Sequence, residues 1–218
     1  MNSENINRRP LKTRQTQWAK VLSRWLIERK VEPNHISILG IVFACMGGII
    51  FISIPLQKSL FFKGIFYIVA ALCIQLRLLC NMLDGMVAVE GNQKSHLGNL
   101  YNELPDRLED TIILVSAGYS IADHTLAYLG WMAALLAVLT AYIRAFGGSL
   151  GTKQYFCGPM AKPHRMAVMT VGCLLASFMI WLNKNNEVIL LSLILVIMGG
   201  MMTCFRRIRL IVEELKTR

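Results

Sequence analysis

Long runs of apolar residues follow one another along the chain from residue 36 onwards, and short polar segments separate them. The runs cover residues 36–56, 62–88, 98–121, 125–148, 164–182 and 187–208. Each run is close to the ~20 residues that an α-helix needs to cross the hydrocarbon core of a bilayer. The pattern therefore predicts an all-α, polytopic membrane protein with six transmembrane helices.

The chain before the first run has an amphipathic pattern instead. Apolar residues recur there at helical spacing, at Trp18, Val21, Leu22, Trp25 and Leu26. A helix with this face and with basic residues opposite suits the membrane interface, although the same face could pack on the protein's own spans. Residues 33–37 then break this helix and can cap the next one. We divide the chain into a basic arm with an interfacial helix, residues 1–32, and a six-helix transmembrane catalytic domain, residues 33–218.

The composition argues for a membrane protein and against a soluble one. Of the 218 residues, 55% are hydrophobic and 17% are charged, with a mean hydropathy of +0.48, whereas about a quarter of a soluble domain is usually charged. The formal net charge is +10, but the basic residues crowd the two termini beside apolar spans. Anionic lipid headgroups are therefore the expected partner, and nucleic acid is not. The cysteines and histidines lack the close spacing of a zinc site.

Basic residues outside the spans also predict an orientation. Nearly all of them fall on the side of the membrane that holds the N-terminus, and the exceptions are Lys58, Lys63 and Lys184. Cytoplasmic loops carry an excess of Lys and Arg. Both termini are therefore expected in the cytoplasm, and residues 81–110 are expected at the cytoplasmic membrane surface.

Residues 81–110 stand out because they are acidic and yet lie between apolar runs. They hold six of the thirteen acids of the chain: Asp84, Glu90, Glu103, Asp106, Glu109 and Asp110. Ionisable side chains beside or inside a membrane span are costly, and by default they mark a functional site. We therefore expect the chemistry of the protein in this segment.

Helical spacing gathers the oxygen-bearing side chains of this segment on two faces. Asn81 and Asp84 share one face with Arg77 a turn earlier, and on the next run Asn102 and Asp106 share a face. Two helices joined by a short loop are antiparallel neighbours, so these faces can meet. Oxygen ligands from two helices suit a hard cation such as Mg²⁺ or Mn²⁺. A carboxylate near such an ion could also take a proton from a substrate hydroxyl.

The spacing of these residues resembles a known family. The segment reads Asn81-x2-Asp84-Gly85-x2-Ala88-Val89-x8-Gly98-x3-Asn102-x3-Asp106. It resembles the signature of CDP-alcohol phosphotransferases, Asp-x2-Asp-Gly-x2-Ala-Arg-x8-Gly-x3-Asp-x3-Asp, at every gap. The six spans, the interfacial helix and residues 33–37 are also similar to that family. Three positions depart from it, because Asn81 and Asn102 replace aspartates and Val89 replaces the arginine.

The resemblance implies an enzyme of phospholipid biosynthesis, placed in a bacterial inner membrane with a cytoplasmic active site. Such an enzyme transfers a phosphatidyl group from a CDP-linked lipid, such as CDP-diacylglycerol, to an alcohol acceptor and releases CMP. The resemblance also implies a divalent metal, Mg²⁺ or Mn²⁺, against the CDP diphosphate. Members of the family commonly form homodimers.

The resemblance assigns roles residue by residue. The expected metal ligands are Asn81, Asp84, Asn102 and Asp106. Asp106 is also the expected general base. Gly85, Ala88 and Gly98 lack bulk, so the nucleotide could approach the helix backbones there, although small residues also serve helix packing.

The asparagines at positions 81 and 102 leave the expected metal site with less negative charge. An asparagine oxygen can ligate a hard cation, but it contributes a dipole rather than a charge. The site could hold one metal, or two with substrate phosphates completing the charge. Alternatively, Glu103 or Asp110 could supply a missing carboxylate as a ligand. The protein could also be a relative that binds without turnover.

Basic residues near the same surface are candidates for binding phosphate or the acceptor. They are Arg77, Arg144, Lys162 and Arg165. Arg77 could instead be an internal partner of Asp84. Lys162 and Arg165 could simply set the topology.

Two other functions stay open at this point. In one, the donor is a soluble CDP-alcohol and the acceptor is a lipid hydroxyl. In the other, the chain is a small cation transporter, which would place its acids near the bilayer centre and break its helices. The acids of this chain cluster toward one surface, which favours the transferase.

Overall fold

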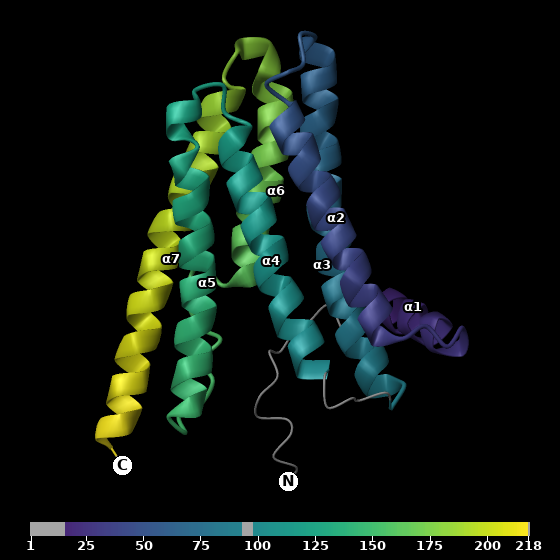
Figure 1. Cartoon of the computed structure of the whole chain (residues 1–218), viewed down its shortest axis with the longest axis vertical. Coiled ribbons are helices and arrows are strands. Elements are labelled where there is room, and N and C mark those ends of the chain that lie inside the picture. The colour runs from purple at the N-terminus through teal and green to yellow at the C-terminus, as the bar shows by residue number, and fades with distance from the viewer. Residues whose placement is uncertain (1–15, 93–97, 218) are drawn as a thin grey trace.

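The computed structural model of the protein describes residues 16–92 and 98–217, and the regular elements in this part of the chain are all helices. They are α1 (Gln17–Glu28), α2 (Pro33–Ser53), α3 (Leu60–Glu90), α4 (Gly98–Tyr119), η3 (His124–Leu126), α5 (Tyr128–Ser149), α6 (Lys162–Met179), η4 (Ile180–Leu182) and α7 (Asn185–Lys216). Figure 1 shows α2 to α7 side by side in one bundle, with α1 at one end. The all-α fold class is confirmed. The basic arm expected before α1 lies outside the described residues.

Five of the described helices are long and apolar enough to cross a membrane. They are α2, α3, α5, α7 and the segment Lys162–Leu182, which joins α6 to η4. The prediction of a polytopic membrane protein is therefore confirmed. Helix α4 corresponds to the third predicted run and lies in the same bundle, but it is not among the five, because its first half carries the acidic cluster.

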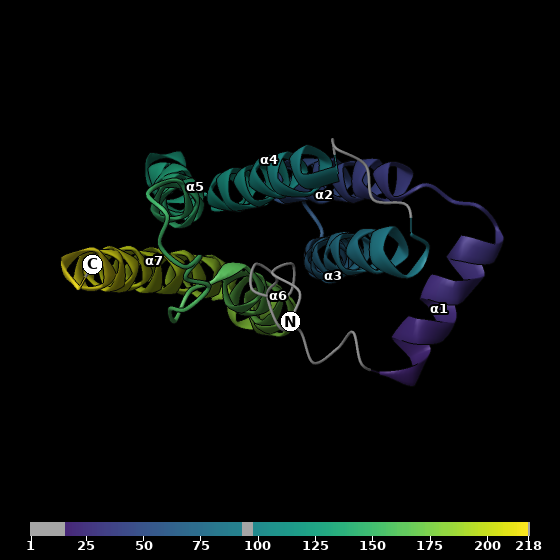
Figure 2. The ribbon, with the colours of Figure 1, turned by 90° about the horizontal axis from the view of Figure 1, so that it is seen from below.

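The bundle has two layers, and its helices contact one another in a closed ring. Figure 2 shows α2, α4 and α5 in one layer and α3, α6 and α7 in the other. Around the ring, α2 contacts α3 and α4, α5 contacts α4 and α7, and α6 contacts α3 and α7. Buried apolar side chains fill the middle, among them Phe51, Tyr67, Leu114 and Met169. Helix α2 thus packs against both helices that carry the acidic cluster.

Helix α1 lies crosswise beside α3 near one end of the bundle (Figure 2) and combines the two roles that its sequence allows. Ala19 and Ser23 are buried on the side that packs against α3, and Ser23 Oγ donates a hydrogen bond to Glu90 Oε2 at 3.0 Å. Trp18 and Trp25 are about half exposed, at 51% and 49%. Exposed tryptophans on an amphipathic helix suit the headgroup layer of a membrane. One face of α1 therefore belongs to the protein, and another is available to lipid.

Helices α4 and α5 cross at two glycines. A Cβ atom at Gly118 would lie 2.7 Å from the carbonyl oxygen of Ala127 and 3.0 Å from Gly130 Cα. A Cβ atom at Gly130 would lie 2.6 Å from the carbonyl oxygen of Leu114. Close approach of two helix backbones requires residues without side chains. This contact holds α4, which carries four of the six acids of residues 81–110, against α5.

Replacing Gly118 by Ala is therefore expected to destabilise the fold by about 1–3 kcal/mol, because the new methyl group meets backbone atoms that cannot move independently. Thermal unfolding of the purified protein in detergent measures this as a lower melting temperature. Gly64→Ala on α3 is the matched control, since its Cβ would lie no closer than 3.4 Å to any neighbour. Equal melting temperatures for the two variants would contradict the close crossing.

Candidate active site

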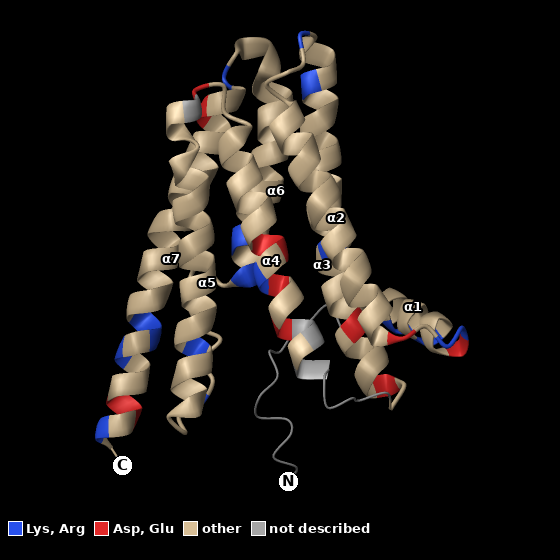
Figure 3. Cartoon of the chain, in the orientation of Figure 1, with Lys and Arg blue, Asp and Glu red and all other residues tan. Residues whose placement is uncertain are grey.

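Acidic and basic residues of α3, α4, α5 and α6 lie toward one end of the bundle, as the coloured ribbon of Figure 3 shows, and several of their side chains are buried. We call this the charged end; it is the end at which α3 stops at Glu90 and α4 begins at Gly98. The acids come from α3 and α4, and their basic partners come from α3, α4, α5 and α6. Charges inside a protein require partners, so the pairing of these side chains defines the candidate site.

Asp84 lies where α3 contacts α2. Its side chain is buried, and Ser37 Oγ donates a hydrogen bond to Asp84 Oδ2 at 2.6 Å. Asp84 Oδ1 has no hydrogen-bond partner within the described residues.

Helix α2 begins at Pro33, but its N-cap is Glu32 and no described side chain caps it, so the predicted capping by residues 33–37 is wrong. Ser37 orients Asp84 instead.

Arg77 joins α3 to α4 through two buried carboxylates. Arg77 Nη1 donates a hydrogen bond to Glu109 Oε2 at 2.9 Å, and Arg77 Nη2 donates one to Asp110 Oδ1 at 2.5 Å. Asn81 Nδ2 donates to the same Glu109 oxygen at 2.7 Å. Arg165 of α6 adds an ion pair from its Nε to Asp110 Oδ2 at 3.2 Å. The polar faces of α3 and α4 do meet, but Arg77 pairs with these two acids rather than with the acid predicted as its internal partner.

Asp106 faces Lys162, the first residue of α6. Lys162 Nζ donates a hydrogen bond to Asp106 Oδ1, and the two side chains are 15% and 14% exposed. Asp84 interacts electrostatically with both of them. The charges of the two aspartates predicted to take part in the chemistry therefore influence each other, although the residues come from different helices.

The loop that leads to Lys162 is held by α7. Arg207 donates hydrogen bonds from Nε to the carbonyl oxygen of Cys157 at 3.0 Å and from Nη1 to a carbonyl oxygen of α5. The hydroxyl group of Tyr155 donates to Glu214 Oε2 at 2.8 Å, and this hydrogen bond raises the pKa of Tyr155. Helix α7 thereby positions the first turn of α6, from which the lysine reaches the candidate base.

Glu103 pairs with two arginines at the other side of α4. Arg144 Nη2 of α5 donates to Glu103 Oε1 at 2.7 Å and to Oε2 at 2.6 Å. Arg107 Nη2 donates to Oε2 at 2.5 Å. The side chain of Glu103 is 52% exposed. Glu103 and Arg144 therefore face the contact of α4 with α5, whereas Asp84 faces α2.

The remaining predicted residues lie on the same stretches of helix. Gly85 is buried and Ala88 is half-buried near the end of α3, and Gly98 is the first residue of α4. The side chain of Asn102 lies outside the described residues. The predicted nucleotide contacts, and metal ligation by Asn102, therefore stay predictions.

Sequence reasoning missed two residues of this arrangement, Ser37 and Glu109. Ser37 ends the segment 33–37 that indicated the start of a helix, and its place one turn inside α2 was the available signal. Glu109 lies three residues after Asp106, which is also helical spacing, whereas the signature residues Asn102 and Asp106 lie four residues apart. Both side chains contact residues of the predicted site.

The oxygen atoms at the charged end fit a hard divalent cation. Asp84 Oδ1 and Glu109 Oε1 are buried oxygens without a hydrogen-bond partner in the part of the chain that the structure describes. Glu109 Oε1 and Asn81 Oδ1 both approach Gly40 of α2. Mg²⁺ and Mn²⁺ prefer such oxygen ligands. Among residues 16–92 and 98–217 no three His, Cys, Asp or Glu side chains converge on one point, so amide oxygens or substrate phosphates would complete the ligand set.

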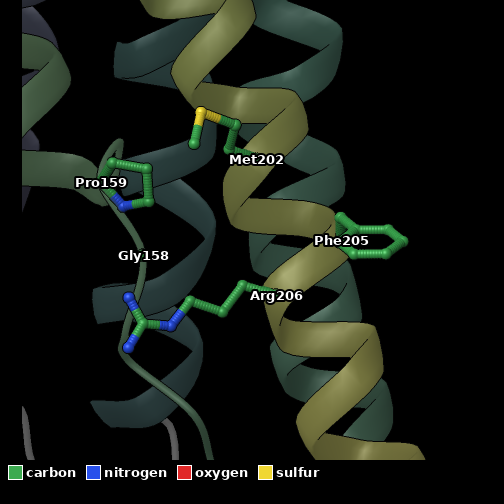
Figure 4. Close-up of a pocket in the computed structure, with 5 residues that line it drawn as sticks. All are labelled: Gly158, Pro159, Met202, Phe205 and Arg206. Carbon is green, nitrogen blue, oxygen red and sulfur yellow. The ribbon is translucent and has the colours of Figure 1, made fainter.

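A separate pocket lies between α7 and the loop before α6. It has a volume of about 490 Å³ and is lined by Gly158, Pro159, Met202, Phe205 and Arg206. In Figure 4 the side chains of Met202 and Arg206 extend toward the loop, whereas Phe205 points away. Gly158 has a φ of +126°, and a Cβ there would overlap Thr203. The pocket contains none of the acids of the charged end.

Residues 30–205 match the sequence model of the CDP-alcohol phosphatidyltransferases. The chain belongs to the CDP-alcohol phosphatidyltransferase family. The resemblance seen in residues 81–106 is thereby confirmed, and this phosphatidyltransferase is an enzyme rather than a transporter. The matched residues include the candidate site from Ser37 to Arg165.

Known proteins similar to this phosphatidyltransferase are membrane proteins and lipid synthases. The inner membrane protein YnbA of Escherichia coli (strain K12) is 23% identical over 181 residues, which cover 83% of this chain and 86% of YnbA. The phosphatidylinositol phosphate synthase PgsA1 of Mycobacterium tuberculosis, solved with CDP-DAG bound, has a TM-score of 0.71 at 19% identity and covers 90% of this chain and 94% of its own. The same synthase in complex with manganese and citrate has a TM-score of 0.70 at 20% identity, covering 88% of each chain.

Proposed function

We propose that this phosphatidyltransferase moves a phosphatidyl group from CDP-diacylglycerol to an alcohol and releases CMP at its charged end. The observation that carries the proposal is geometric: Lys162 Nζ of α6 donates a hydrogen bond to Asp106 Oδ1 of α4, and Asp84 of α3 is buried near enough for both charges to act on it. Two carboxylates and one cation from three neighbouring helices suit a diphosphate that is bound through metal. The PgsA1 structure with CDP-DAG bound shares the fold, which supports a lipid donor.

The family depends on a divalent metal, Mg²⁺ or Mn²⁺, and the manganese complex of PgsA1 shares the fold of this chain. The residues that would hold the metal are Asn81, Asp84, Asn102 and Asp106. When bound, the metal neutralises charge on the diphosphate and makes CMP a better leaving group. Glu103 stays a candidate ligand, although its two oxygens already accept hydrogen bonds from arginines.

The protein's own residues position the donor and move the proton. Asp106 accepts the proton of the acceptor hydroxyl while that oxygen forms a bond to the phosphatidyl phosphorus. The bond between this phosphorus and the oxygen of CMP breaks, and CMP leaves with the bonding electrons. Lys162 changes partner from Asp106 to a phosphate oxygen as the substrate binds. Ser37 keeps Asp84 oriented throughout.

The basic residues fall into two groups by their present partners. Arg144 and Lys162 pair with acids that are partly exposed, so a substrate phosphate can compete for them. Arg77 and Arg165 pair with buried acids and are 0% and 3% exposed. We therefore assign phosphate or acceptor contacts to the first group and a positioning role to the second.

The charged end faces the cytoplasm in this proposal, together with both termini. Cytoplasmic loops are rich in Lys and Arg, and exposed basic residues such as Arg209 and Lys216 occupy the last turns of α7. These residues would contact anionic headgroups. A lipid donor then presents its diphosphate at the charged end while its acyl chains stay in the bilayer.

Release of CMP tests the proposal. Membranes that contain the protein are incubated with Mn²⁺, CDP-diacylglycerol and one alcohol at a time from a panel of polyols and their phosphates. We expect CMP to appear with at least one acceptor and not with membranes that lack the protein. A second arm supplies a soluble CDP-alcohol and diacylglycerol. CMP release in that arm alone would reverse the roles of donor and acceptor, and release in neither arm would contradict the proposed reaction.

A further inference from the structure

The amide of Asn81 lies against a buried carboxylate that is not part of the family signature. Position 81 carries an amide where that signature has an aspartate, so the site lacks one negative charge there. Asn81 Nδ2 donates a hydrogen bond to Glu109 Oε2 at 2.7 Å, and the Glu109 side chain is fully buried. The Glu109 carboxylate therefore lies within hydrogen-bond distance of the residue that stands where the signature has an aspartate.

The second oxygen of Glu109 is free to bind a ligand. Glu109 Oε2 accepts hydrogen bonds from Arg77 and Asn81, but Glu109 Oε1 is buried without a hydrogen-bond partner among the described residues. A buried carboxylate oxygen without a partner is costly. Such an atom in a native site calls for an ion, a water molecule or a substrate.

Gly40 of α2 shows where this oxygen points. A Cβ atom at Gly40 would lie 2.7 Å from Glu109 Oε1 and 3.5 Å from Asn81 Oδ1, so both oxygens face the same point beside the α2 backbone. Ser37, one turn earlier on α2, binds Asp84 Oδ2 and leaves Asp84 Oδ1 without a partner. Oxygens of three residues, two of them buried without a hydrogen-bond partner among the described residues, therefore lie along one stretch of α2.

The other acids near the site are already engaged. Both oxygens of Glu103 accept hydrogen bonds from arginines, and this side chain is half exposed. Asp110 Oδ1 accepts from Arg77, and Asp110 Oδ2 forms an ion pair with Arg165. Among these described acids, Glu109 combines complete burial with an oxygen that no basic side chain contacts.

We infer that Glu109 replaces the signature aspartate at position 81 as a ligand of the divalent cation. Glu109 Oε1 joins Asn81 Oδ1 and Asp84 Oδ1 beside α2, and its carboxylate supplies the negative charge that position 81 lacks. Arg77 holds Glu109 in place through the other oxygen. The inference rests on the proposed function and names one ligand that the family signature does not contain.

Binding of Mn²⁺ to the purified protein in detergent, without substrate, tests the inference. Free Mn²⁺ is measured by its electron paramagnetic resonance signal. Glu109→Gln is expected to raise the Kd for Mn²⁺ by at least about 10-fold, as loss of a ligand or its close support does in metal sites. Glu90→Gln is the matched control, because Glu90 also lies at the charged end but bonds to Ser23; its Kd should equal that of the unchanged protein.

An exchange of the two side chains separates a ligand from a structural residue. In the double variant Asn81→Asp with Glu109→Gln, the carboxylate and the amide trade places, and the Kd should return to within about threefold of the original value. A Kd that is unchanged in Glu109→Gln overturns the inference. If Glu109→Gln raises the Kd and the double variant does not restore it, the inference is also overturned, because Glu109 would then act only through Arg77.

Two further measurements keep the test decisive. If Glu109→Gln does not fold, Glu109→Asp retains the charge beside Arg77 but withdraws the oxygen, and it should also weaken Mn²⁺ binding; equal binding overturns the inference. The unchanged protein is assayed for Mn²⁺ binding and CMP release in parallel. If the unchanged protein neither binds Mn²⁺ nor releases CMP, the proposed function itself is wrong. If it does both and Glu109→Gln binds Mn²⁺ equally well, only the role of Glu109 is wrong.

Discussion

Replacement of Asp106 by Asn is expected to reduce turnover by about 100- to 10,000-fold, the usual contribution of a general base. Asparagine keeps the size of the side chain but cannot accept the proton of the acceptor hydroxyl. The oxygen that receives the hydrogen bond from Lys162 has a counterpart in the amide, so the first turn of α6 should stay in place. The rate of CMP release at saturating donor and acceptor measures the effect.

The same variant should still bind the nucleotide. CDP affinity in the presence of Mn²⁺ is expected to change by less than the rate does, because Asp84 and Lys162 remain. Asp123→Asn provides an identical change of charge at the opposite end of the bundle, where Asp123 bonds to Thr125, and it should leave the rate unaltered. A rate for Asp106→Asn equal to that of Asp123→Asn would remove Asp106 as the base.

Replacement of Arg77 by Met is expected to lower the free energy of unfolding by about 3–5 kcal/mol, because it leaves the buried Glu109 without its cation and the buried Asp110 with Arg165 alone. Arg77 and Glu109 are 0% exposed and Asp110 is 1% exposed, so water cannot take over the role of the guanidinium group. Thermal unfolding in detergent measures the loss as a fall in melting temperature.

Arg107→Met supplies the comparison for this prediction. Arg107 also forms an ion pair with an acid of α4, but its partner Glu103 is 52% exposed and keeps a second arginine. Removal of a partly exposed ion pair costs about 1 kcal/mol or less. If the two arginine variants melted at the same temperature, burial would not decide the contribution of these pairs.

The sequence was sufficient to predict the helices and the residues of the signature. Apolar runs near the length of a membrane span predicted the long helices, and Pro33 begins α2 as the breaker at that point indicated. The fixed spacing from Asn81 to Asp106 predicted the family, because it depends on helical periodicity and not on which helices are neighbours. Asp84 of α3 and Asp106 of α4 lie near enough for their charges to interact.

The partners of the buried charges could not be predicted in the same way. A short connection suggested that α3 and α4 are antiparallel neighbours. In the structure they contact each other only slightly, and α2 packs extensively against both of them. Consequently Ser37 contacts Asp84, and Glu109 rather than Asp84 receives the first hydrogen bond from Arg77. Such choices depend on the rotation of each helix about its axis, which the pattern of apolar residues specifies only coarsely.

The hydrogen bond from Ser23 to Glu90 connects α1 to the end of α3 that carries Asp84. Glu90 follows Asp84 by six residues on one continuous helix, which is about 9 Å along its axis. If the proposed function is correct, the depth at which the two exposed tryptophans of α1 enter the membrane sets the depth of the reaction. A pyrophosphate attached to a glycerolipid would then lie at that depth, whereas a freely diffusing nucleotide would have to be drawn to it.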